Sequence, residues 1–264
     1  GDSQFLEAVI RNDPQVLLRS DVSTAGEELR SRLFDRLVEE ITTEDTQQVF
    51  SDVRGHLDKL KHSNLASQLI AALNRHPTNT TVLRFVLTVC EVCREERLIS
   101  EMIGISLDTS IDCRTRACAV YAASAIGRDI DLGKLRPLAL ERCEDDSYDE
   151  LLGSALECLW PRKLITAEEV FSRLTEPRRR FFLGAYRYAL KTSFIKAMTP
   201  KDMAIALQWC CERIKKASIA NDFVDLIQSI VKGAVPLLDD DDIREWFAEY
   251  VVAHYENSHF RLPD

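Results

Sequence analysis

Glycine and proline, the residues that most often form tight turns and interrupt regular structure, are scarce in this sequence. Its 264 residues contain 9 Gly and 8 Pro, mostly at places where a helix would end. Almost no stretch alternates polar and apolar residues with the period of two that a half-buried strand requires. A fold rich in sheet needs many short strands joined by turns, so this composition argues against one.

Long apolar runs are missing as well. The longest nearly apolar run, ACAVYAASAIG, has 11 residues, whereas a membrane-spanning helix needs about 20. No secretory signal opens the chain. We therefore expect no membrane segment and a cytoplasmic location.

Sequence motifs of common enzymes are also absent. There is no G-x-x-x-x-G-K-[ST] phosphate loop, no G-x-G-x-x-G turn, no H-E-x-x-H and no G-x-S-x-G. None of the five histidines has metal-ligand spacing or a neighbouring nucleophile that looks activated: His56, His62, His76, His254 and His259. We expect no enzyme activity, no catalytic residue and no cofactor, although an unfamiliar helical enzyme could hide its site between repeats.

Two stretches could hold a metal, but each has a simpler explanation. Cys90-x-x-Cys93 with Cys113 and Cys118 loosely imitates a four-thiolate zinc pattern. The first two instead continue an apolar helical stripe, and a buried free cysteine packs as a small core residue. The acidic run LDDDDIREW lacks the Gly and terminal Glu of an EF-hand loop, and acids favour a helix start. We expect reduced, packed thiols and no metal.

Helical periodicity is what the sequence does contain. In CEDDSYDELLGSALECLWP, residues 143–161, Ser147 and Glu150 have capping-box spacing, which predicts a helix start. Pro161 ends the helix at Trp160 because proline lacks the next N–H. One apolar stripe is predicted, made by Leu151, Leu152, Ala155, Leu156 and Leu159.

A unit of similar pattern, LDTSIDCRTRACAVYAASAIG, lies 38 residues earlier. A period near forty, made of loop, helix, turn and helix, is typical of HEAT and armadillo repeats.

Further helix signals lie elsewhere in the sequence. Thr24 with Glu27 and Thr166 with Glu169 have capping-box spacing, and 178–194 also has helical periodicity. We predict an all-α superhelix of stacked antiparallel helix pairs. It would form one module over 1–264, with a soft seam at 161–177.

The pattern also resembles a known family. The runs RNDPQVLLRSDVS and DELLGSALECLWPRKLITAEEVFSRLTEP, followed by FFLGAYRYAL, resemble the helical-repeat region of bacterial NACHT-type or STAND signalling NTPases. The resemblance covers about residues 11–190. It implies a sensor, autoinhibitor or scaffold in defence or stress signalling, with an NTPase module or a sensed protein as the partner. This chain has no Walker motif, so any nucleotide hydrolysis would lie outside it. Its start at Gly1 rather than Met suggests a piece excised from a longer protein.

Charge gives the one local functional clue. Residues 161–220 hold 13 Lys and Arg against 5 Asp and Glu, within a chain of net charge −9. We expect a partner-binding strip made of Arg178, Arg179, Arg180, Arg187 and Lys191, with the last three on a helical face opposite Phe181, Ala185 and Tyr188. A solvated face paired with nearby carboxylates is the simpler alternative. An acidic protein surface is the favoured partner. Nucleic-acid binding by a free-standing repeat protein is the alternative, which the overall acidity disfavours.

Overall fold

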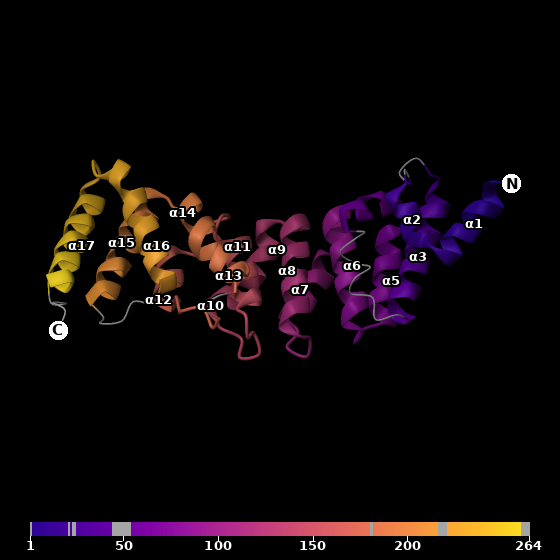
Figure 1. Cartoon of the computed structure of the whole chain (residues 1–264), viewed down its shortest axis with the longest axis horizontal. Coiled ribbons are helices and arrows are strands. Elements are labelled where there is room, and N and C mark those ends of the chain that lie inside the picture. The colour runs from indigo at the N-terminus through magenta and orange to yellow at the C-terminus, as the bar shows by residue number, and fades with distance from the viewer. Residues whose placement is uncertain are drawn as a thin grey trace. The chain divides into compact units, whose positions relative to one another are not determined.

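Helices make up all of the regular structure in the described part of the chain (Figure 1). The computed structural model describes residues 2–20, 22, 25–43, 54–179, 182–215 and 221–259. None of these residues lies in a strand, so the prediction of an all-α fold is confirmed. The chain divides into two compact units, 1–132 and 133–264. The seam predicted at 161–177 lies inside the second unit.

The described part of the first unit consists mainly of helices. Its α-helices are α1 (Asp2–Asn12), α2 (Pro14–Arg19), α3 (Glu27–Thr43), α5 (Leu65–Arg75), α6 (Thr80–Cys93), α7 (Ile99–Leu107), α8 (Cys113–Ile126) and α9 (Asp129–Leu132). Two 3-10 helices, η2 (Arg54–Leu60) and η3 (Glu96–Leu98), lie between them. The capping residue predicted at Thr24, just before α3, lies outside the described residues.

Helices α6 and α8 carry the core of this unit. Helix α8 packs against both α6 and α7, and its small buried side chains allow close approach: Ala117, Ala119, Ala122 and Ala123. On α6, Cys90 and Cys93 are buried in the same stripe as Val82, Val86 and Val89. The prediction that these cysteines are packing residues is confirmed.

The second unit begins with the 3-10 helix η4 (Gly133–Leu135). Its further elements are α10 (Arg136–Leu140), α11 (Glu150–Leu159), α12 (Ala167–Arg173), α13 (Ala185–Tyr188), the π-helix η5 (Ala189–Ser193), α14 (Phe194–Ala197), α15 (Pro200–Lys215), α16 (Asn221–Ala234), the 3-10 helix η6 (Val235–Leu237) and α17 (Asp241–His259). A row of aromatic contacts runs through its core, with ring centroids 5.3–6.2 Å apart, through Trp160, Phe194, Phe171, Trp209 and Phe223. Each of these five rings is buried.

Two helix starts in this unit test the capping predictions. Thr166 and Glu169 make the full capping box that begins α12, as predicted. Helix α11 also spans the predicted stretch, and its apolar stripe is buried. Its cap differs, because Asp146 rather than Ser147 accepts the free amides of the first turn, from Glu150 (2.9 Å), Leu151 (2.9 Å) and Leu152 (3.2 Å). A carboxylate with two oxygens can accept more amides than one hydroxyl can.

Many polar contacts between elements in both units join residues 25 to 41 positions apart, and several of them lie near 35. In the first unit, the Cys93 thiol lies 3.4 Å from the Leu57 carbonyl, 36 residues away, and Arg97 donates to Ser63, 34 residues away. In the second unit, three side chains contact carbonyls 34, 35 and 39 residues away: Trp160 with Phe194, Cys211 with Trp246, and Arg213 with Leu174. Each contact therefore joins segments that lie about one helix pair apart along the chain.

Candidate protein-interaction surface

The predicted basic strip begins at Arg178, which the second unit uses internally. Its backbone N–H donates to Asp149 Oδ2 (2.7 Å), and its Nη1 donates to the carbonyls of Glu144 (2.7 Å) and Asp146 (2.9 Å). The side chain is 28% exposed. Arg178 thus ties the loop after α12 to the loop before α11.

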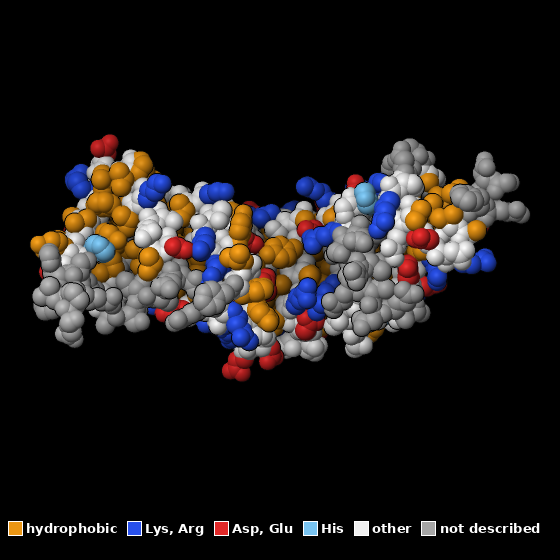
Figure 2. Space-filling view, in the orientation of Figure 1, with side chains coloured by type: hydrophobic (Ala, Val, Ile, Leu, Met, Phe, Trp, Pro, Cys, Tyr) orange, Lys and Arg blue, Asp and Glu red, His pale blue; other side chains and the backbone are white. Residues whose placement is uncertain are grey.

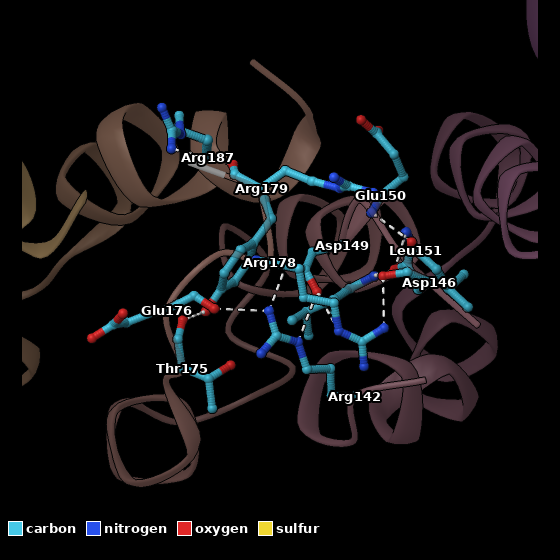
Figure 3. A network of polar contacts seen from close by, with 12 residues as sticks. Arg142, Asp146, Asp149, Glu150, Leu151, Thr175, Glu176, Arg178, Arg179 and Arg187 are labelled. Carbon is cyan, nitrogen blue, oxygen red and sulfur yellow. Dashed lines mark hydrogen bonds and ion pairs between the residues drawn. The ribbon is translucent and has the colours of Figure 1, made fainter. Parts of the chain in front are cut away.

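Asp149 is the centre of this network. Its side chain is 1% exposed and receives two hydrogen bonds from Arg142, from Nε to Oδ1 (2.7 Å) and from Nη2 to Oδ2 (2.6 Å). This two-pronged pairing raises the pKa of the Arg142 guanidinium. Figure 3 shows Arg142 and Arg178 reaching Asp149 from different sides. The backbone of Asp149 has φ 56°, in the left-handed region that aspartate tolerates better than most residues.

Asp146 lies beside Asp149 and is also buried, with 3% of its surface exposed. Burial raises the pKa of its carboxyl group, and the amides of Leu152, Glu150 and Leu151 that it accepts oppose this shift. The loop 143–149 is therefore held from within by two buried carboxylates, one bound to backbone amides and the other to arginines.

Arg187 and Lys191 of the predicted strip differ in exposure and in the groups that they contact. Arg187 is 8% exposed, and its Nη2 donates to the Arg179 carbonyl (3.4 Å). The Lys191 Nζ lies 2.6 Å from Asp225 Oδ2. Arg180 lies outside the described residues. Figure 3 shows Arg187 apart from the pairing of Arg142 with Asp149.

The facing predicted for this segment holds at Ala185, which is buried, and fails at Arg187, which is also buried. The helix starts only at Ala185, and Tyr188, expected on the apolar side, is 57% exposed. The stripe that faces the core consists of Ala185, Tyr186, Ala189 and Leu190. Tyr186 can occupy the core position because its hydroxyl donates to the Thr175 carbonyl (2.6 Å).

An exposed aromatic surface, which sequence reasoning missed, lies over this network. The rings of Tyr148 and Phe182 are 4.7 Å apart, and the Arg179 guanidinium lies 5.7 Å from the Tyr148 ring centre. Tyr148 is 48% exposed, Phe182 40% and Leu183 84%. We call Tyr148, Arg179, Phe182 and Leu183 the Tyr148 patch. One feature of the sequence could have revealed this patch. Phe182-Leu183-Gly184 places an apolar pair beside a glycine, in a segment that the periodicity assigned to a helix.

The residue types in this patch are those of protein interfaces. Tyr, Phe and Arg are enriched in interface cores, and Tyr and Arg are frequent hot spots. On the face of the second unit seen in Figure 2, apolar side chains lie beside lysine and arginine side chains. Asp149 and Arg142, which precede α11, contact Arg178 and Glu176, which follow α12, so the two segments that carry the patch are joined by polar contacts.

Other kinds of site find little support among the described residues. No three His, Cys, Asp or Glu side chains gather there as metal ligands would. None of the helices described combines the length and apolar character that crossing a bilayer requires. Comparison with known proteins finds no matching family model, no matching curated protein and no matching solved structure.

Proposed function

We propose that this chain is a non-catalytic protein-interaction module built as a HEAT-like α-solenoid. Two features support the solenoid. Within each unit, helices pack mainly on neighbours one or two elements along the chain, as α6 does with α5 and α8 and as α15 does with α16 and α17. Side-chain contacts with carbonyls also recur at separations near 35 residues. Nearest-neighbour stacking of this kind is what defines repeat proteins.

The observation that carries the interaction role is the Tyr148 patch. It exposes two aromatic rings, a leucine and an arginine together, on loops braced by a buried ionic network. Isolated exposed apolar residues are ordinary, whereas a clustered group with an arginine is typical of a binding site.

The partner that we propose has an acidic surface. Arg179 lies at the patch, and the surrounding segment 161–220 is strongly basic within an acidic chain. Nucleic acid fits less well, because Arg178, Arg187 and Lys191 already contact groups of the protein itself. Fewer cations than the sequence suggested remain to contact phosphates.

The cellular role that we propose is that of a sensor or autoinhibitory array in a bacterial NACHT/STAND-type signalling NTPase in the cytoplasm. The sequence resemblance over about residues 11–190 supports this role. The partner of the Tyr148 patch would then be the NTPase module of the same protein or a protein ligand that the array senses.

The test is a double substitution, Tyr148→Ala with Phe182→Ala, in the full-length signalling protein. If the patch holds the NTPase module, basal activity or oligomerisation without trigger rises. If it binds the sensed ligand, the response to the trigger is lost. The control is Ile130→Ala in the first unit, where an apolar side chain is 76% exposed. Unchanged basal activity and trigger response, with thermal stability equal to that of the control, would contradict the role proposed for the patch.

A further inference from the structure

A second surface feature lies between α12 and α15, away from the residues that form the Tyr148 patch. It is a hollow of about 200 Å³. Its apolar lining comes from Phe171, Trp209 and Ile205, and its polar lining from Glu168, Ser172, Gln208 and Glu212. Pockets for drug-sized ligands have about 300–1,000 Å³, so this hollow is suited to one side chain rather than a whole small molecule.

The two charged residues that line the hollow are both acidic. Glu168 comes from α12 and Glu212 from α15, and both residues are exposed. Across the described residues, no cation lies within ion-pair distance of either carboxylate. The hollow is therefore lined by two carboxylates from different helices above an apolar floor, an arrangement that complements a cationic side chain.

The protein itself contains an example of the contact that would form there. The guanidinium of Arg213 lies 5.3 Å from the ring centre of Trp209 and 4.9 Å from that of Phe223. Arg213 does not line the hollow, and it donates to the Leu174 carbonyl (2.8 Å). The same aromatic cluster thus already accepts a planar guanidinium, which stacks on rings better than an ammonium does.

We propose that the hollow between α12 and α15 is a docking pocket for an arginine side chain presented by a protein partner. The aliphatic stem of the arginine packs on Ile205 and the edges of Phe171 and Trp209. Its guanidinium pairs with the carboxylates of Glu168 and Glu212. Arginine suits the site because its flat group can pair with a carboxylate while lying against a ring. This proposal does not depend on the Tyr148 patch, which attracts the opposite charge.

The experiment titrates the whole chain with N-acetyl-arginine amide and follows the indole N–H signal of Trp209 by two-dimensional NMR. Replacing Trp209 with Phe assigns that signal among the three tryptophans. We expect a saturable shift in the millimolar range, and a much weaker response to N-acetyl-citrulline amide, which has nearly the same shape without the charge. The variant Glu168→Gln with Glu212→Gln should weaken the affinity about 2- to 30-fold, as expected from losing two exposed ion pairs.

The matched control is Glu245→Gln, which removes one exposed carboxylate from α17 of the same unit and should leave the titration unchanged. Since all three glutamates are exposed, these variants should fold normally. An equal shift with citrulline amide, an unchanged affinity in the double variant, or no shift of the Trp209 signal would overturn the pocket. Tighter binding of N-acetyl-lysine amide would overturn the choice of arginine. None of these outcomes bears on the Tyr148 patch, so the two proposals fail separately.

Discussion

At the scale of single residues, Asp149 joins several parts of the second unit. It accepts two hydrogen bonds from Arg142 and one from the backbone of Arg178, and its own backbone is left-handed. A buried carboxylate without partners would destabilise the fold, so Asp149 can stay buried only while the arginines contact it. One buried carboxylate therefore joins the two segments that carry the Tyr148 patch.

Replacing Asp149 with Asn tests this dependence. Asn tolerates the left-handed backbone and keeps one acceptor oxygen, so the substitution removes the charge and replaces the second acceptor with a donor that faces an N–H group. We expect the free energy of unfolding in urea to fall by about 1.5–3 kcal/mol, the range for hydrogen bonds to charged groups. Asp145→Asn, at an exposed position in the same loop, is the control and should change stability by less than about 0.5 kcal/mol. Equal stabilities of the two variants would contradict the role assigned to Asp149.

At the scale of elements, the packing of α11 on α13 depends on one glycine. A Cβ atom added to Gly153 would overlap the backbone nitrogen of Tyr186 and lie 2.6 Å from its Cα. These are backbone atoms, which cannot rotate away as a side chain can. The two helices therefore approach so closely that this position accepts only glycine.

The prediction compares two Gly-to-Ala substitutions within helices. In an exposed helix interior, alanine is more favourable than glycine by about 0.5–1 kcal/mol, so Gly104→Ala in α7, where nothing lies within 4 Å, should stabilise the protein. Gly153→Ala should instead destabilise it by about 1–3 kcal/mol or more, because overlap outweighs helix propensity. Thermal and denaturant unfolding would measure both. A stabilised Gly153→Ala variant would show that α11 and α13 are not in close contact.

The buried thiols of α6 give a second prediction at this scale. Burial raises the pKa of both Cys90 and Cys93 to about 12 from an ordinary value of 9.0. At pH 8, only about one thiol in ten thousand would be ionised, and the thiolate is the reactive form. Iodoacetamide at pH 8 should therefore label the partly exposed Cys143 well before these two, as read by mass spectrometry. Labelling of Cys90 or Cys93 as fast as in urea would contradict their burial.

The same shift makes stability depend on pH. Because the folded pKa exceeds the unfolded one, the thiols contribute their full stabilisation below pH 9, and this contribution is lost as pH rises toward 12. The stability difference between the protein and its Cys90→Ala, Cys93→Ala variant should shrink over that range. A constant difference would mean that the thiols titrate alike in both states.

At the scale of the whole molecule, the proposed solenoid makes a prediction about size. A compact globular chain of this length has a radius of gyration of about 18 Å. Because stacked repeats contact only their neighbours, an array extends as repeats are added, and its radius exceeds this value. Small-angle X-ray scattering of the monomer would measure it. A radius near 18 Å would contradict the solenoid, while leaving the all-α fold untouched.

The sequence by itself determined where several helices begin and end. The capping box of Thr166, the stop before Pro161 and the buried stripe that includes Cys90 and Cys93 follow from interactions between residues three or four apart. Such interactions are local, so periodicity and capping residues reveal them without any knowledge of the fold. The all-α class follows from the same local signals.

Only the tertiary structure decided what the charged and aromatic residues do. Arg178 meets Asp149, Tyr148 meets Phe182 and Glu168 lines a hollow with Glu212, each across about 30 to 45 residues. A count of charges along the chain cannot tell an arginine that binds an internal carboxylate from one that faces solvent, because the partner is brought close only by stacking of helices. For the same reason, the residues of the predicted strip have different roles. Arg178 and Arg187 contact carbonyls of the protein itself, whereas Arg179 lies over the exposed ring of Tyr148.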